Sequence, residues 1–122
     1  HALAIPLGAH FKIPHGTVNA ILLPEVMQYN LMGNLDKFKT IAQIFGMPVD
    51  HMPPWEAAEL SVIAVRKLKQ DVGIHQTLSD FGVTEDALDR IAEEAMTSGN
   101  VPVNPRRPTL EDLKQICREA MK

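Results

Sequence analysis

The chain contains 122 residues, of which 45% are hydrophobic and 22% charged, and its formal net charge at pH 7 is −3. This composition is that of one globular domain and excludes a disordered chain. There is no basic excess to neutralise phosphates, and the longest apolar runs are short, one of them ending at Pro24. We therefore expect neither nucleic acid nor a membrane as a partner. The single cysteine, Cys117, has no internal disulfide partner and suits the reducing cytoplasm.

Helical periodicity recurs along the chain between glycines and prolines, and strand patterns are nearly absent. The expected helices span residues 1–9, 15–30, 34–45 and 54–72, a fifth that Thr84 caps and that ends before Ser98, and a last one that Thr109 opens. Gly8 is expected near the end of the first helix, and Pro24 should kink or loosen the second. Asp112, three residues after Thr109, predicts a weaker form of the capping box.

The spacing of apolar residues also predicts which faces are buried. In the third and fourth helices the expected inner faces are formed by Leu35, Phe38, Ile41, Ala42, Phe45, Trp55, Ala58, Val62, Val65, Leu68 and Val72. The pattern as a whole predicts an all-α fold, a single helical bundle of about five or six helices over residues 1–122. Because the chain begins at His1 inside a helical pattern rather than at a methionine, we interpret it as part of a longer polypeptide.

The opening stretch HALAIPLGAHFKIPHG contains three histidines, His1, His10 and His15. Imidazole is the commonest nitrogen ligand of zinc and ferrous iron, and a turn that folds His15 back on His1 would let the two share one ion. Their spacing is not a compact zinc signature, and two ligands are fewer than the usual three or four. The alternative interpretation is that His1 is a frayed terminus, His15 a helix-start residue and His10 a solvated or pocket-rim residue.

The same residues carry a resemblance to a known family. The stretch HALAIPLGAHFKIPHGTVNAILLPEVMQYN, together with DVGI at residues 71–74, NPR at residues 104–106 and the TLEDL start of the last helix, resembles the iron-containing (group III) alcohol dehydrogenases. The resemblance covers essentially the whole chain. It implies that the chain is part of the C-terminal helical domain of a metal-dependent oxidoreductase that interconverts alcohols and aldehydes or ketones.

In that family an N-terminal α/β domain binds NAD(H) or NADP(H), and a divalent Fe²⁺ or Zn²⁺ lies in the cleft between the two domains. The resemblance implies that one Asp and three His hold this ion, and that His1 and His15 match two of them. The nucleotide domain, its glycine-rich loop, the Asp and the third His are expected outside this sequence. We therefore expect the chain alone to be inactive, with the remainder of the parent chain as its partner and a homodimer or higher oligomer as its assembly.

Two further positions are assigned to the substrate pocket by the same resemblance. Ile5 stands where many members have a histidine one helical turn after the first ligand, so a proton relay through Ile5 is excluded; it would narrow or dry the pocket, or be plain core. Asn100 lies in a loop that resembles one near the substrate, although short polar loops are also simple connectors. The alternative function is a stand-alone helical interaction module without catalytic activity, and the particular alcohol or aldehyde does not follow from the sequence.

Overall fold

The computed structural model describes all residues, 1–122, and contains six α-helices, three short 3₁₀ helices and no strand. In chain order the elements are α1 (Ala4–Phe11), α2 (His15–Asn30), η1 (Leu31–Gly33), α3 (Leu35–Ile44), α4 (Pro54–Asp71), η2 (Leu78–Phe81), η3 (Glu85–Ala87), α5 (Leu88–Met96) and α6 (Leu110–Ala120). The predicted all-α bundle of five or six helices is confirmed. None of the helices combines the length and the apolarity that a bilayer crossing requires.

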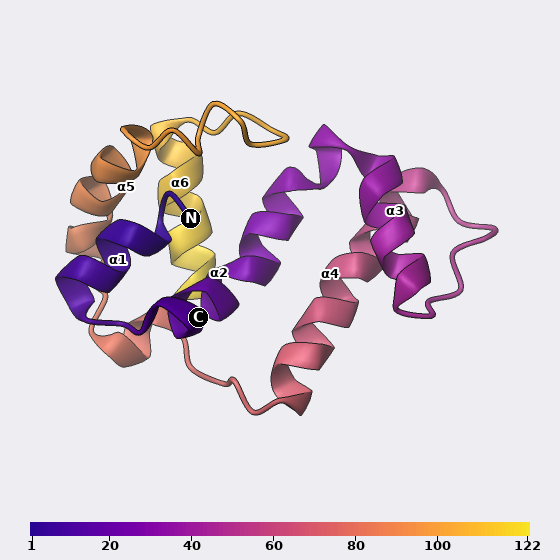
Figure 1. Cartoon of the computed structure of the whole chain (residues 1–122), viewed down its shortest axis with the longest axis horizontal. Helices are drawn as coiled ribbons and strands as arrows, with labels where there is room; N and C mark the ends of the chain where they lie inside the picture. Colours follow the sequence, from indigo (N-terminus) through magenta and orange to yellow (C-terminus); the bar gives the residue numbers. More distant parts are fainter.

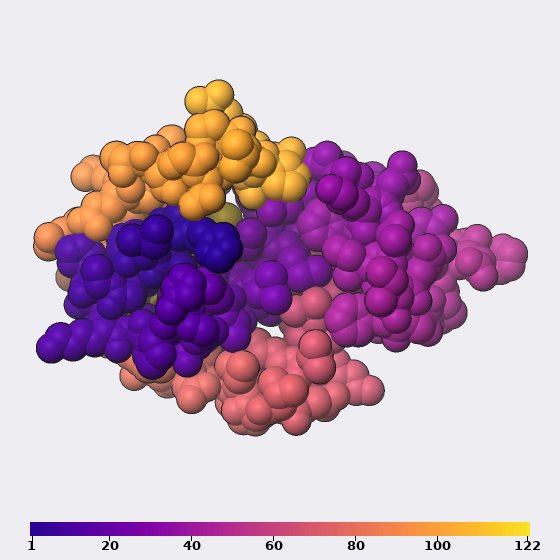
Figure 2. Space-filling model, in the orientation of Figure 1, coloured from indigo at the N-terminus to yellow at the C-terminus, as the bar shows by residue number.

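The helices form two lobes that share α2. Figure 1 shows α1, α5 and α6 gathered on one side, the paired helices α3 and α4 on the other, and α2 running between the two groups. The larger lobe has a core of seventeen buried residues. The α3–α4 lobe is held by two smaller clusters, one of which includes Met27 and the other Val49. The long connection from α4 to α5 then returns the chain to the larger lobe (Figures 1 and 2).

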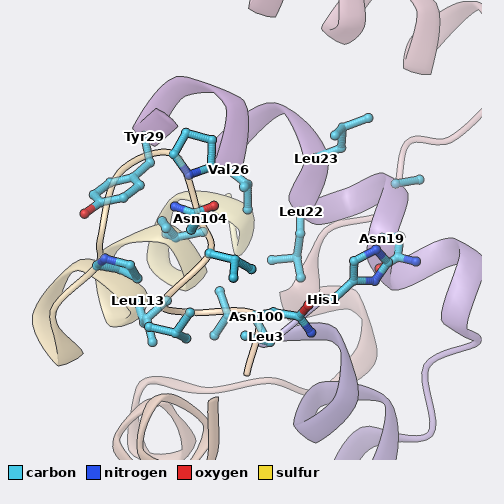
Figure 3. Close-up of a pocket in the computed structure, with 17 residues that line it drawn as sticks. His1, Leu3, Asn19, Leu22, Leu23, Val26, Tyr29, Asn100, Asn104 and Leu113 are labelled. Carbon is cyan, nitrogen blue, oxygen red and sulfur yellow. The ribbon is translucent and has the colours of Figure 1, made fainter. Parts of the chain in front are cut away.

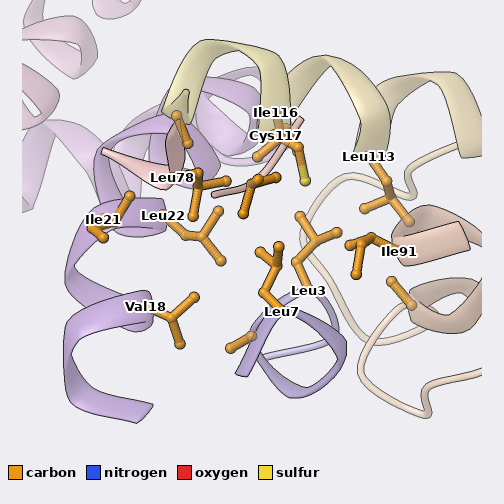
Figure 4. Close-up of a cluster of buried hydrophobic side chains, with 14 of the residues drawn as sticks. Leu3, Leu7, Val18, Ile21, Leu22, Leu78, Ile91, Leu113, Ile116 and Cys117 are labelled. Carbon is orange, nitrogen blue, oxygen red and sulfur yellow. The ribbon is translucent and has the colours of Figure 1, made fainter. Parts of the chain in front are cut away.

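The core of the larger lobe is built from one apolar face of each surrounding helix. Leu7 from α1 is fully buried, as are Leu78 from η2 and Leu88 from α5. In Figure 4, Leu7 points between α2 and α6, towards Leu22 and the buried Cys117. Each buried side chain of this size contributes about 1.5–3 kcal/mol to the free energy of folding. The cluster therefore determines how α1 packs against α2.

Several helix ends lie where the sequence signals predict. The Asn34 side chain accepts a hydrogen bond from the backbone N–H of Lys37 at 3.1 Å, which caps α3. At the start of α6 the backbone N–H of Thr109 donates to Asp112 Oδ2 at 2.9 Å, and the N–H of Asp112 donates to the Thr109 hydroxyl at 3.2 Å. The reciprocal capping box is therefore confirmed.

The first helix differs from the prediction at both ends, because it begins at Ala4 rather than His1. It continues through Gly8 to Phe11, two residues beyond the expected end, and Lys12 follows with φ 55° in the left-handed region. Gly8 lies inside the helix, where a Cβ would meet the carbonyl oxygen of Ile13 at 3.3 Å. The chain therefore turns back tightly after α1, and Ile13 is buried beneath the turn.

The predicted inner faces of the third and fourth helices are partly wrong. Ala58 and Val62 are buried as expected, whereas Phe45, Trp55, Leu68 and Val72 are 44–62% exposed and do not join the core. The helix α4 has 18 residues and its main packing partner, α3, has 10, so the ends of the α4 stripe extend beyond the residues that cover its middle.

The fifth helix begins later than predicted. Thr84 adopts an extended conformation before η3, and its side chain makes no capping hydrogen bond. The regular helix α5 starts at Leu88, after the three-residue 3₁₀ turn. Its apolar residues Leu88, Ile91 and Ala95 are nevertheless buried as their spacing predicts.

Candidate metal centre

The fold brings the two predicted metal ligands together. His1 precedes α1, and His15 is the first residue of α2. The tight turn after α1 reverses the chain, so that the start of α2 lies near residue 1. The ring centroids of His1 and His15 lie 6.1 Å apart, with an angle of 15° between the ring planes. Both side chains are exposed, which leaves their ring nitrogens accessible from outside the core.

This separation fits shared binding of one ion. An ion about 2.1 Å from one nitrogen of each ring would leave the ring centres roughly 5–6 Å apart. The coordinating nitrogen aims along its ring plane, and the two rings are stacked nearly parallel, so they would have to turn before both nitrogens face one point. No third His, Cys, Asp or Glu of the chain joins the pair. The pair fits about half of a four-coordinate shell, and further ligands would have to come from outside these residues.

Asn19 is a site residue that the sequence analysis did not single out. It lies one helical turn after His15 on α2, and its Nδ2 is 3.1 Å from His15 Nε2. The amide donates here when Nε2 carries no proton, and in that neutral tautomer the ring proton is on Nδ1. The contact therefore orients the imidazole and occupies its one free lone pair. Binding of an ion through Nε2 would require the Asn19 side chain to turn away. The spacing of four residues on one helix face is the signal that would have identified it.

A cavity of about 500 Å³ opens beside His1. Most of its lining residues are apolar and come from α2, α6 and the segment that joins α5 to α6. In Figure 3, His1 and Asn19 lie at one end of the cavity, Tyr29 and Asn104 at the other, and Leu22 lies between them. A largely apolar cavity of this size with a few polar groups is typical of a small-molecule site.

The two residues assigned to the substrate pocket occupy different places. Asn100 lines the cavity together with His1. Ile5 is not among the lining residues, and 62% of its surface is exposed. Their roles in the intact protein stay predictions. His10 is separate from the pair: its Nε2 lies 2.9 and 3.0 Å from the two carboxylate oxygens of Glu94 on α5.

Ionisable groups near the cavity are held in structural contacts. The Tyr29 hydroxyl lies 3.0 Å from the carbonyl oxygen of Arg107 and 3.1 Å from Asp112 Oδ2. Burial, followed by the hydrogen bond to Asp112, raises the pKa of Tyr29. The hydrogen bond from the backbone N–H of Thr109 is the largest cause of the lowered pKa of Asp112. Cys117 lies behind the cavity wall, and burial raises its pKa to about 12, so its thiol is not a nucleophile near neutral pH.

Comparison with known proteins gives one consistent answer. The sequence model of the Fe-containing alcohol dehydrogenase family, C-terminal, matches residues 1–121. Over 120 residues the chain is 42% identical to 1,3-propanediol dehydrogenase of Citrobacter freundii and 41% identical to lactaldehyde reductase of Escherichia coli K12, covering 98% of this chain and 31% of each relative. The crystal structure of a 1,3-propanediol oxidoreductase superimposes with a TM-score of 0.94 at 40% identity, with 98% and 31% coverage.

The chain thus spans about a third of the length of the curated relatives that it matches. The match extends across all six helices, from α1 to α6, and includes both histidines of the pair. The sequence likeness and the shared fold agree, and we conclude that this chain belongs to the Fe-containing alcohol dehydrogenase family, in its C-terminal region.

Proposed function

We propose that this chain forms part of a metal-dependent, NAD(P)-linked oxidoreductase that interconverts alcohols and aldehydes or ketones. In this proposal residues 1–122 are one helical domain, partial because its first helices and the α/β nucleotide-binding domain belong to the rest of the parent chain. The observation that carries the proposal is the 6.1 Å approach of the His1 and His15 rings, of which His1 lines an apolar cavity. The relatives' names, which denote alcohol and aldehyde chemistry, support the reaction class.

His1 and His15 would hold a divalent Fe²⁺ or Zn²⁺ as two of its ligands. When bound, such an ion supplies Lewis-acid polarisation of an alcohol or carbonyl oxygen. Each histidine must bind through a neutral imidazole, so protonation of either ring at acid pH competes with the ion. Asn19, at 3.1 Å from His15 Nε2, would orient that ring before the ion arrives.

The cavity would receive the organic part of the substrate. Its apolar walls from α2 and α6 would exclude water around the reacting carbon, which would favour hydride transfer over side reactions. Asn100 would present a polar group at the rim of the cavity. The exposed Ile5 side chain would narrow or dry the pocket once the rest of the enzyme covers it. The nicotinamide cofactor would be bound mainly by the rest of the parent chain. Among the relatives, the methanol dehydrogenase of Bacillus methanolicus is NAD-dependent and the butanol dehydrogenase of Clostridium saccharobutylicum is NADPH-dependent, so either cofactor is compatible.

As a separate polypeptide the chain should be inactive, because it provides only two imidazoles and no nucleotide site. Its partners would be a small alcohol or aldehyde and the remainder of the parent chain, in a homodimer or higher oligomer. The single, buried Cys117 suits a reducing cytoplasm.

The experiment is metal analysis of the intact dehydrogenase that contains this sequence, together with alcohol-dependent reduction of NAD or NADP. The wild type is compared with His15→Ala and with a matched control, His75→Ala, which removes an exposed histidine far along the chain from the pair. Loss of one of four ligands should remove most of the bound metal and lower turnover at least a hundredfold, whereas the control should retain both.

Two results would decide against the proposal. If His15→Ala retains metal and turnover, His15 is not a ligand. If the wild type contains no metal and oxidises no alcohol with either cofactor, the chain acts instead as a helical interaction module. The 122-residue chain, assayed alone, should show no alcohol oxidation.

A further inference from the structure

The segment between α5 and α6, residues 97–109, forms one wall of the cavity. Its first half contributes Asn100, Val101 and Val103 to the lining, and its second half contributes Asn104 and Pro105. Within the segment the backbone is supported by only a few hydrogen bonds, such as the one from the N–H of Val101 to the Ser98 carbonyl at 3.3 Å. A loop with so little internal support needs an external anchor to keep a defined shape.

The second half of the segment is anchored on the C-terminal end of α2. Asn30 is the last residue of α2 and is 93% buried. Its Nδ2 donates to Asn104 Oδ1 at 3.1 Å, and Asn104 Nδ2 donates back to Asn30 Oδ1 at 2.7 Å. The second hydrogen of Asn104 Nδ2 goes to the carbonyl oxygen of Arg106. The two amides therefore satisfy each other almost completely, in a setting where an unpaired amide would cost several kcal/mol.

Two further contacts tie the same segment to α2 and η1. The guanidinium of Arg106 lies over the Tyr29 ring, 4.3 Å from its centroid, and its Nη1 donates to the Tyr29 carbonyl oxygen at 3.2 Å. Gly33, at the end of η1, packs directly against the backbone of Pro105. A Cβ at position 33 would lie 2.6 Å from the Pro105 carbonyl oxygen, so only glycine permits this approach.

We propose that Asn30, Gly33, Asn104 and Arg106 form a clamp that positions the cavity wall for substrates with an apolar tail. The clamp's polar atoms are already paired within the protein, and no buried side-chain nitrogen or oxygen lacks a partner. They are thus not available to recognise a ligand. Figure 3 places Asn104 and Tyr29 at the end of the cavity away from His1, where the far end of a bound molecule would lie.

Asn30, Gly33 and Arg106 are positioning residues, because none of them lines the cavity and they act through the shape of the Asn100–Val103 wall. Asn104 belongs to the clamp and also lines the cavity. A loosened clamp should let this wall move relative to Leu22 and Leu113, which also line the cavity. Long apolar substrates would then lose packing along the whole wall, whereas a two-carbon substrate held near His1 would touch only its Asn100 end. The inference rests on the proposed function in so far as it names an alcohol as the occupant.

The first test is hydrogen exchange on the intact protein that contains this sequence, with Gly33→Ala compared with Gly99→Ala. Gly99 lies in the same segment, but a Cβ there meets nothing within 4 Å, so it controls for the glycine-to-alanine change itself. Gly33→Ala should raise the exchange rates of the Val101 and Asn104 amides about tenfold and leave α4 unchanged. Unchanged rates at these amides, or an equal rise throughout the chain, would overturn the clamp.

The second test measures kinetics of the intact enzyme with ethanol and 1-hexanol, for wild type, Gly33→Ala and Gly99→Ala, because Gly33 does not line the cavity. The clamp predicts that Gly33→Ala raises KM for 1-hexanol about tenfold, while KM for ethanol and kcat stay within about twofold and metal content is unchanged. An equal loss for both alcohols would mean that Gly33 matters for folding only, and would overturn the positioning role. If the wild type oxidised neither alcohol, the proposed function would fail, and hydrogen exchange would still decide whether the clamp exists.

Discussion

The turn between the two histidines depends on a residue in a strained conformation. Lys12 has φ 55° and ψ 37°, which closes α1 and redirects the chain towards His15. A residue with a Cβ in this left-handed region is disfavoured by about 1–2 kcal/mol relative to its right-handed form. Glycine avoids that penalty but loses about 0.5–1 kcal/mol more conformational entropy on folding. The comparison of Lys12→Gly with Lys12→Ala therefore isolates the strain, because both variants remove the lysine side chain.

We expect Lys12→Gly to be more stable than Lys12→Ala by about 0.5–1 kcal/mol, from the difference between those two terms. For a chain of this size the difference corresponds to roughly 2–4 °C in Tm. Urea unfolding followed by circular dichroism gives the free energies, and calorimetry gives Tm. The matched pair is Lys67→Gly and Lys67→Ala, at an exposed position inside α4. There the order should reverse, with the glycine variant less stable by about 1 kcal/mol.

The sign reversal between positions 12 and 67 is the decisive feature. If Lys12→Gly were less stable than Lys12→Ala by the same amount as in the Lys67 pair, residue 12 would have a helical conformation. The chain would then lack the turn that brings His15 to His1. A stabilised Lys12→Gly variant should also retain the histidine pair, since the backbone path is unchanged.

Three other perturbations have magnitudes that follow from burial, capping and ionisation. Leu7→Ala removes a fully buried side chain and should cost about 2–5 kcal/mol of unfolding free energy in urea, whereas Ile44→Ala, at a position 79% exposed, should cost less than about 0.5 kcal/mol; similar losses would contradict the assigned core. Thr109→Ala breaks the capping box of α6 and should cost about 1 kcal/mol in the same assay, and no loss would mean that the cap is not formed in solution. Burial raises the pKa of Cys117 from 9.0 to about 12, so the folded state keeps a proton that the unfolded chain loses. The resulting stability is complete below pH 9 and should fall by roughly 1.4 kcal/mol per pH unit above it; urea unfolding of Cys117→Ala at pH 8 and 10 should lack this part of the pH dependence, and an identical dependence in both proteins would refute it.

The elements that the sequence predicts well are those with local signals at both ends. The helix α2 begins directly after Pro14 and ends at Asn30, as predicted, and the capping box of Thr109 fixes the start of α6. The end of α1 was missed because its closing residue is Lys12, and nothing in a lysine's local pattern indicates a left-handed conformation. Periodicity also identifies a face without saying what covers it, which is why Trp55 was wrongly assigned to the core.

The sequence indicated the two candidate ligands and Asn100 of the cavity lining, but not the cavity itself. The family resemblance indicates His1 and His15 as candidate ligands. They are fourteen positions apart, and the turn after α1 brings their rings together. The cavity was not predictable, because its walls come from the beginning, the middle and the end of the chain. The pairing of Asn30 with Asn104 joins residues 74 positions apart and leaves no trace in the local pattern of either segment.

One helix connects all these features. Within its 16 residues α2 carries His15 at its first position, Leu22 in both the core and the cavity wall, and Asn30 in the clamp at its last. A helix of this length extends about 24 Å, so its two ends are too far apart to contact the same small ligand. The buried Pro24 removes one backbone hydrogen bond near the middle, but packing on both sides holds the helix in place. Since α2 also joins the two lobes, the relative position of His15, Leu22 and Asn30 is set by how this single helix packs. A change in the α3–α4 lobe therefore reaches the cavity through α2, or through Gly33 of η1, which packs against Pro105.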